Sequence, residues 1–258
     1  MNRLRTAKAG LVVLAGLAML LLATAASAQH AVFRIRGRVV TDAGAPVGDA
    51  DVRIEAFYGY AAGTFSGQRL FSARTDAKGA WSIGALQPGV WLFEVLAPGF
   101  LPETVVLPPR LLTTVSQGTS GLSMPWELIL KAERIPDGDR GLVLKAASDA
   151  ARDGKNDEAR SALLTVPADA DADYLAAAGR IAVVARDMAT AATLFKRAID
   201  RDPASYRATL GVASTLLIQR DFDSASRAFD AARNRTHDKD EQRFISAAIG
   251  ELAAIMYR

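Results

Sequence analysis

Hydrophobic and polar residues alternate along the first part of the chain, as they do in strands with one buried face. Phe33, Ile35 and Val39 fall on one side of the first such segment, and arginines 34, 36 and 38 fall on the other. Residues 52–56 repeat this alternation, and residues 90–96 are apolar except for Glu94, which is typical of a strand covered on both faces. Turn sequences rich in Gly and Pro separate these segments, and a last strand is predicted at 126–130. The pattern predicts a β-sandwich.

The second part of the chain has a helical pattern that repeats. The dipeptide Arg-Asp occurs at 152, 186 and 220, at intervals of 34 residues. Ala191, Phe195 and Ala198 recur at the same interval as Ala225, Phe229 and Ala232. A period of this length, with small and bulky apolar residues at fixed offsets, predicts stacked helix pairs. Residues 238–257 read as a final helix that caps the stack.

The two patterns meet at residues 134–139, a polar stretch that contains Pro136 and Gly138. We therefore predict an α+β chain built from separate domains. An all-β, seven-stranded sandwich at 29–135 is followed at 136–258 by an all-α solenoid of about three repeats with a capping helix.

The first 28 residues have the three-part layout of a secretory signal peptide. Arg3, Arg5 and Lys8 precede an uncharged apolar run at 11–22, and Ala26-Ser27-Ala28 provides a cleavage site. We expect cleavage after Ala28, with retention as an anchor as the alternative, and no membrane span in the rest of the chain. The expected compartment is the periplasm, and the extracellular space is the alternative.

The net positive charge of the whole chain comes from that segment. The whole chain carries 31 Lys and Arg against 28 Asp and Glu, a net charge of +3. Three of the basic residues and no acidic ones lie in residues 1–28, so the expected mature chain is neutral. Composition therefore does not favour nucleic acid as a partner.

Several short motifs occur in a fixed order between residues 31 and 107. They are Gly37-Arg-Val-Val-Thr-Asp42, Gly44-x-Pro46-Val, Arg74-Thr-Asp-Ala-Lys-Gly79-x-Trp81, Leu86-x-Pro88-Gly89-x-Trp91 and Ala97-Pro98-Gly99-Phe100. This order resembles the carboxypeptidase regulatory-like domain. The resemblance implies a transthyretin-like sandwich that serves as an accessory module and not as a catalytic one.

The 34-residue repeat is similar to the tetratricopeptide (TPR) family at Gly179, Ala191, Phe195, Ala198 and Pro203. The next repeat matches at Ala213, Ala225, Phe229 and Ala232, and a first repeat at 141–171 is looser. The resemblance implies a concave groove lined by the first helix of each pair. It places these residues in the groove, where we expect a protein segment to bind: Asp173, Arg180, Val183, Arg207, Leu210, Ser214 and Leu217. The alternative is that Val183, Leu210 and Leu217 are core residues.

The sequence contains few of the residues that usually carry out catalysis. It contains no Cys, and its two histidines, His30 and His237, lie far apart without a zinc-binding or nucleophile motif around them. Asp169, Asp171 and Asp173 resemble the start of a calcium loop, but Tyr174 and Arg180 occupy the positions of the required Gly and Glu. We interpret these aspartates as acidic residues at a helix N-terminus, and we expect no enzyme activity, no cofactor and no metal.

Two features of the sandwich are further candidates for binding. Tyr58, Tyr60 and Phe65 lie in a Gly-rich loop and either stack on a sugar ring or fold back onto the core. Arginines 34, 36 and 38 either bind an anionic polymer or acidic patch, or form a solvated edge that discourages strand addition.

These observations predict an exported, non-enzymatic protein-interaction scaffold that binds a partner segment through the TPR groove. One alternative is a carbohydrate- or cell-wall-binding module that uses the three loop aromatics. The other is a regulatory subunit of a separate exported enzyme.

Overall fold

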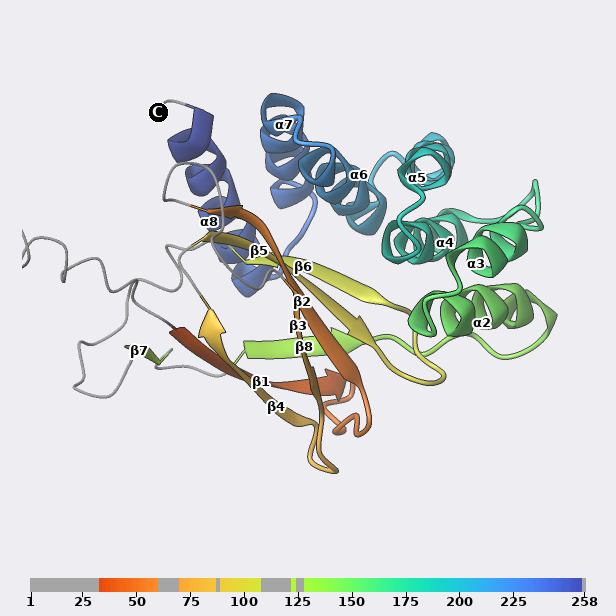
Figure 1. Cartoon of the computed structure of the whole chain (residues 1–258). Coiled ribbons are helices and arrows are strands. Elements are labelled where there is room, and N and C mark those ends of the chain that lie inside the picture. Colours follow the sequence, from red (N-terminus) through yellow and green to blue (C-terminus); the bar gives the residue numbers. More distant parts are fainter. Residues whose placement is uncertain (1–32, 60–69, 87–88, 108–121, 124–127, 257–258) are drawn as a thin grey trace, which may run out of the picture.

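The structure is a computed structural model, and it describes residues 33–59, 70–86, 89–107, 122–123 and 128–256. Its strands form two sheets (Figure 1). The sheet that we call outer contains β1 (Phe33–Thr41), β4 (Ala80–Leu86), β7 (Leu122–Ser123) and β8 (Leu128–Ala132). The sheet that we call inner has the order β3 (Leu70–Arg74), β2 (Asp51–Gly59), β5 (Gly89–Leu96) and β6 (Glu103–Leu107). β1 lies inside the outer sheet, because it pairs antiparallel with β4 on one side and parallel with β7 and β8 on the other.

The sandwich core forms between the two sheets from the apolar half of each alternating strand. Ile35 and Val39 of β1 are fully buried, as the sequence predicted. The ring of Trp81 lies 6.0 Å from that of Phe93, centroid to centroid, and links β4 of the outer sheet to β5 of the inner sheet. Alternation therefore identified the buried side of these strands.

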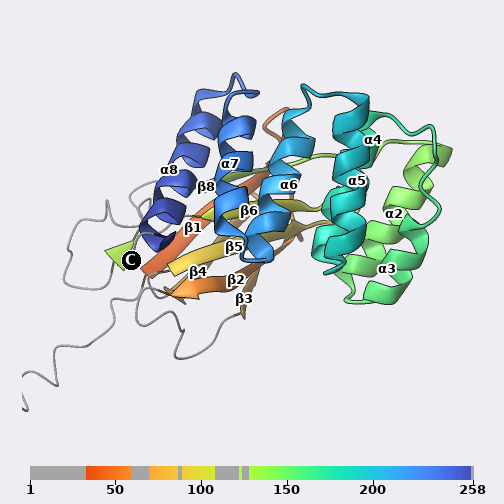
Figure 2. The same ribbon diagram turned by 90° about the horizontal axis from the view of Figure 1, so that it is seen from above.

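The helical part follows directly, with α2 beginning at Asp139. Its helices are α2 (Asp139–Arg152), α3 (Asn156–Leu163), α4 (Ala172–Val184), α5 (Met188–Arg201), α6 (Tyr206–Ile218), α7 (Phe222–Arg233) and α8 (Lys239–Met256). They run side by side as an array of antiparallel pairs (Figure 2). The predicted order of a sandwich followed by a TPR-like helical part is confirmed.

The repeated Arg-Asp dipeptide forms the turn within a helix pair. Arg186 and Arg220 both adopt left-handed backbone conformations, with φ of 59° and 63°. The carboxylate of Asp187 then accepts a hydrogen bond from the Thr190 amide and caps α5, and Asp221 caps α7 in the same way. In the looser first repeat, Gly154 adopts the left-handed conformation and the cap residue of α3 makes no side-chain hydrogen bond.

Phe195 fills the seam between successive repeats. A Cβ atom on Gly179 of α4 would lie 2.6 Å from its ring, and one on Gly211 of α6 would lie 2.3 Å from it. The two glycines therefore allow α4 and α6 to approach the same aromatic ring from either side.

The helices form a third layer against the inner sheet (Figure 1). Leu92 and Leu96 of β5 point away from the sandwich core, and yet they are only 2% and 1% exposed. Leu96 joins the core cluster of α2, α4 and α5, and Leu92 joins that of α6, α7 and α8. The strand predicted to be covered on both faces is covered by the sandwich on one face and by the helices on the other.

Candidate functional site

The first helices of the repeats direct arginine side chains at the sandwich. Arg180 of α4 donates from Nη1 to Oε2 of Glu103 on β6 and from Nη2 to Oε2 of Glu133 after β8, each at 2.7 Å. Arg207 of α6 also binds Glu133. Arg180 is only 9% exposed, so its charge is neutralised largely inside the protein.

Arg186 makes a second connection of the same kind from the loop between α4 and α5. Its Nη1 lies 2.7 Å from Oε1 of Glu94 on β5, and its Nη2 lies 2.6 Å from Oε2 of Glu55 on β2. Burial raises the pKa of Glu94 above its usual value of 4.5, and the opposing charge of Arg186 only partly offsets this. The left-handed turn that defines the repeat thus also positions the arginine that holds the sheet.

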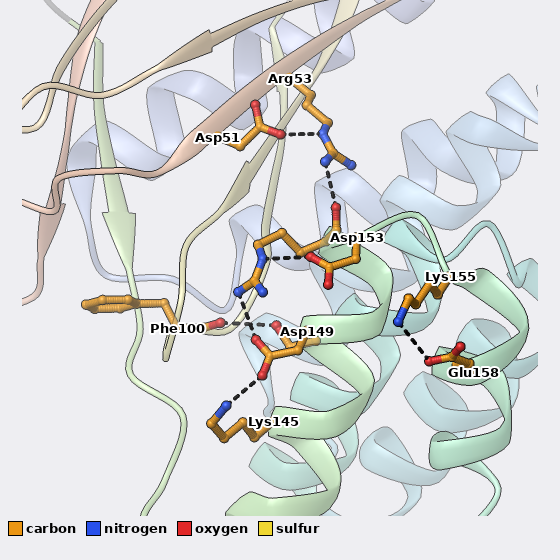
Figure 3. A network of polar contacts seen from close by, with 10 residues as sticks. Asp51, Arg53, Phe100, Lys145, Asp149, Asp153, Lys155 and Glu158 are labelled. Carbon is orange, nitrogen blue, oxygen red and sulfur yellow. Dashed lines mark hydrogen bonds and ion pairs between the residues drawn. The ribbon is translucent and has the colours of Figure 1, made fainter.

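A third contact joins β2 to the end of α2 (Figure 3). Arg53 donates from Nη2 to the carbonyl oxygen of Arg152 at 2.7 Å, while its Nε binds Asp51. Ser148 of α2 donates to the carbonyl oxygen of Phe100 at 3.2 Å. These polar contacts, together with the buried leucines of β5, hold the array against the sandwich.

The predicted groove residues divide according to this interface. Arg180, Val183, Ser214 and Leu217 are buried, Leu210 is half-buried, and Asp173 and Arg207 are exposed. In this conformation the middle of the groove face contacts the chain's own residues. A partner segment has access to that part only if the inner sheet moves away from it.

Tyr206 of α6 is a half-buried residue close to this interface. Tyr206 of α6 lies near the carboxylates of Glu241 and Glu103, and burial together with these charges raises the pKa of its hydroxyl far above the usual value. Its hydroxyl therefore stays protonated and uncharged at physiological pH.

The other predicted sites fall elsewhere. Tyr60 and Phe65 lie outside the described residues, and so does the side chain of Tyr58, whose backbone is part of β2. Asp171 caps α4 by accepting a 2.8 Å hydrogen bond from the Tyr174 amide, in keeping with the interpretation of these aspartates as helix N-terminal residues. Within the described ranges no group of three or more His, Asp and Glu is arranged to hold a metal ion, and no helix is long and apolar enough to cross a membrane.

Arginines 34, 36 and 38 are exposed on the face of the outer sheet that points away from the helices. The interpretation of this row as the protected edge of a sheet is wrong, because β1 is paired on both sides. Alternation along one strand predicts which side chains share a face, but it contains no information on strand order.

Sequence reasoning missed the glutamates that the arginines bind. They are Glu55, Glu94, Glu103 and Glu133, which lie on or next to four different strands. Glu94 was the residue from which such a pair could have been predicted. A single carboxylate in an otherwise apolar strand that is covered on both faces requires a cation in the layer above it.

One part of the chain matches a known family. Residues 34–120 match the family model of the carboxypeptidase regulatory-like domain. The sandwich has that family's sequence pattern. The predicted resemblance is thereby confirmed for this part of the chain, which is less than half of its length.

Several solved structures are similar to part of this chain. The TPR domain of Sgt2 from Aspergillus fumigatus is 15% identical with a TM-score of 0.38, over 48% of this chain and 85% of that one. PcrH in complex with the chaperone-binding region of PopB is 18% identical with a TM-score of 0.36, over 44% and 93%. Chlorocatechol 1,2-dioxygenase from Pseudomonas putida is 16% identical with a TM-score of 0.33, over 41% of this chain and 61% of the enzyme. The match thus spans less than two thirds of that enzyme's length. The comparison with curated proteins gives no match.

Proposed function

We propose that this protein is an exported, non-enzymatic interaction scaffold that binds a protein partner on a face left open by the chain. The observation that carries the proposal is the forked contact of Arg180 with Glu103 and Glu133. Because the repeat array uses the middle of its groove to hold its own sandwich, the two parts form a fixed platform. A partner then binds outside the helix–sheet interface.

The remaining parts of the proposal rest on the sequence. Residues 1–28 support export through their signal-peptide layout. The absence of Cys and the presence of only two histidines support a non-enzymatic role, and His237 is exposed in the loop before α8.

Site-specific photocrosslinking in an exporting bacterium tests the proposal. A benzoylphenylalanine is placed at Ile129 of the outer sheet, at Leu142 of α2 or at Leu210 in the groove. Ile129 and Leu142 are 46% and 62% exposed, whereas Leu210 is half-buried. We expect a protein adduct from an open-face position and none from Leu210. Intact mass of the recovered chain is expected to show removal of residues 1–28.

Different outcomes contradict different parts of the proposal. Adducts from Leu210 alone would mean that a partner displaces the inner sheet and occupies the groove. A recovered chain that keeps its first residue and stays in the cytoplasm would refute export.

A further inference from the structure

The exposed face of the outer sheet carries a row of positive charge, which we call the arginine face and define as arginines 34, 36 and 38 of β1. Ile129 and Lys131 of β8 are exposed beside the row, and Ile129 lies directly opposite Arg38 in the strand register. On the other side, β4 presents the small residues Ala80, Ser82 and Gly84. The long arginine side chains therefore rise above their neighbours.

No residue that the structure describes balances the charges of Arg34 and Arg36, whereas Lys131 beside the row lies 4.0 Å from Asp238. None of the outward-facing positions in β1, β4 and β8 is Asp or Glu. Arg34 and Arg36 form no ion pair with any residue that the structure describes, whereas Arg180, Arg186 and Arg207 all bind glutamates. Among the described residues, the arginines of the internal interface are thus neutralised by glutamates, whereas Arg34 and Arg36 are not.

Protection of a sheet edge does not explain the row. Charged residues on an edge strand prevent pairing with another chain, but β1 is an interior strand. A row of like charges on one face also carries mutual repulsion, which an anionic partner relieves.

We propose that the arginine face binds an extended acidic segment of a protein partner, with Asp or Glu at alternate positions. This inference rests on the proposed function and names the chemistry of its partner. Residues two apart in a strand are separated by about 6.6 Å, so alternate carboxylates of an extended peptide recur at the same interval as the arginines. Guanidinium groups bind carboxylates through paired hydrogen bonds, and Ile129 offers an apolar contact beside them.

The test uses the full chain and two fluorescein-labelled peptides of identical composition. One peptide alternates Glu and Thr over eight residues, and the other groups its Glu residues at one end. Binding is measured by fluorescence anisotropy at low salt and again at about 0.5 M salt, where surface charges are screened. We expect the alternating peptide to bind more tightly than the grouped one, and salt to weaken its binding.

Two charge-matched variants locate the site. The R34Q/R36Q/R38Q variant is expected to lose about tenfold in affinity for the alternating peptide. The control variant R74Q/R201Q/R227Q removes the same charge from other exposed positions and is expected to bind as the wild type does. Circular dichroism checks that both variants fold, and single R34Q and R36Q variants replace the triple variant if it does not.

Three binding results would overturn the inference. They are equal losses in both triple variants, equal binding of the two peptides, and tighter binding of polygalacturonate or oligo(dT) than of the alternating peptide. Crosslinked adducts from Leu142 but not from Ile129 would refute the arginine face and leave the scaffold intact. Peptide binding without any protein adduct in the cell would instead refute the proposed function.

Discussion

Arg180 of α4 and Glu103 of β6 lie 77 residues apart in the sequence and are joined at 2.7 Å across the helix–sheet interface. Glu133 accepts the second arm of the same guanidinium. One side chain thereby connects the repeat array to both sheets, because Glu103 begins β6 and Glu133 directly follows β8.

We expect R180M to lower the free energy of unfolding by about 2 kcal/mol, since two glutamates lose a charged hydrogen bond. Urea denaturation of R180M, E103Q and the double variant measures the coupling between the two side chains. The control K196M removes an exposed i,i+4 pair with Asp200 and is expected to change stability little. Additive effects of R180M and E103Q would show that the contact contributes nothing of its own.

Glu94 gives the interface a pH dependence of known sign. Its pKa is raised in the folded protein by burial, while Arg186, Glu55 and Arg53 are the charges that act on it. The folded state therefore binds the proton more readily than the unfolded state does. Stability from this group is fully present below the usual pKa of 4.5 and is lost as pH rises through the raised pKa.

The E94Q variant isolates that effect because glutamine does not titrate. We expect the wild type to gain stability relative to E94Q as pH falls from about 8 to about 5. Urea denaturation at several pH values gives the difference between the two proteins. A difference that stays constant, or that moves in favour of E94Q at low pH, would contradict the raised pKa.

Local patterns in the sequence predicted the elements and not their partners. The alternation in β1 gave its buried face, and the Arg-Asp dipeptide marked a turn and a helix cap, because both features depend on residues close together in the chain. The contact of Arg186 with Glu94 spans 92 residues and depends on how the array lies on the sheet. Alignment to the positions of a repeat family predicts which residues line a groove, but it does not predict what occupies that groove.

Adding a single methyl group at Gly211 is expected to lower the stability of the protein strongly. Its Cβ position lies 2.3 Å from two ring carbons of Phe195, which is fully buried. We expect G211A to destabilise the protein by about 1–3 kcal/mol through overpacking. Thermal denaturation of G211A and of G211A/F195L measures the loss and its partial recovery with the smaller side chain.

Gly250 of α8 supplies the matched control, because nothing lies within 4 Å of its Cβ position. There the same substitution reduces the conformational entropy of the unfolded chain, and we expect a gain of about 0.5–1 kcal/mol. Equal melting temperatures for G211A and G250A would contradict the packing of Phe195 between α4 and α6.

Asp187 combines a helix cap with a contact between helix pairs. Its carboxylate accepts hydrogen bonds from the amide and hydroxyl of Thr190 and from Nε of Arg160 in α3, the last at 2.9 Å. Burial opposes ionisation, but these hydrogen bonds outweigh it and hold the pKa below the usual 3.8. We expect D187A to lower the free energy of unfolding by about 1–2 kcal/mol at neutral pH.

The pH dependence of that loss is opposite to that of Glu94. A lowered pKa means that the contribution is present above the usual value and disappears as pH falls through the folded value. The cost of D187A should therefore shrink when urea denaturation is repeated at about pH 3. D169A, at an exposed loop aspartate, is the control and is expected to change stability little at either pH. A cost that is the same at both pH values would show that packing, and not the ionised carboxylate, stabilises this turn.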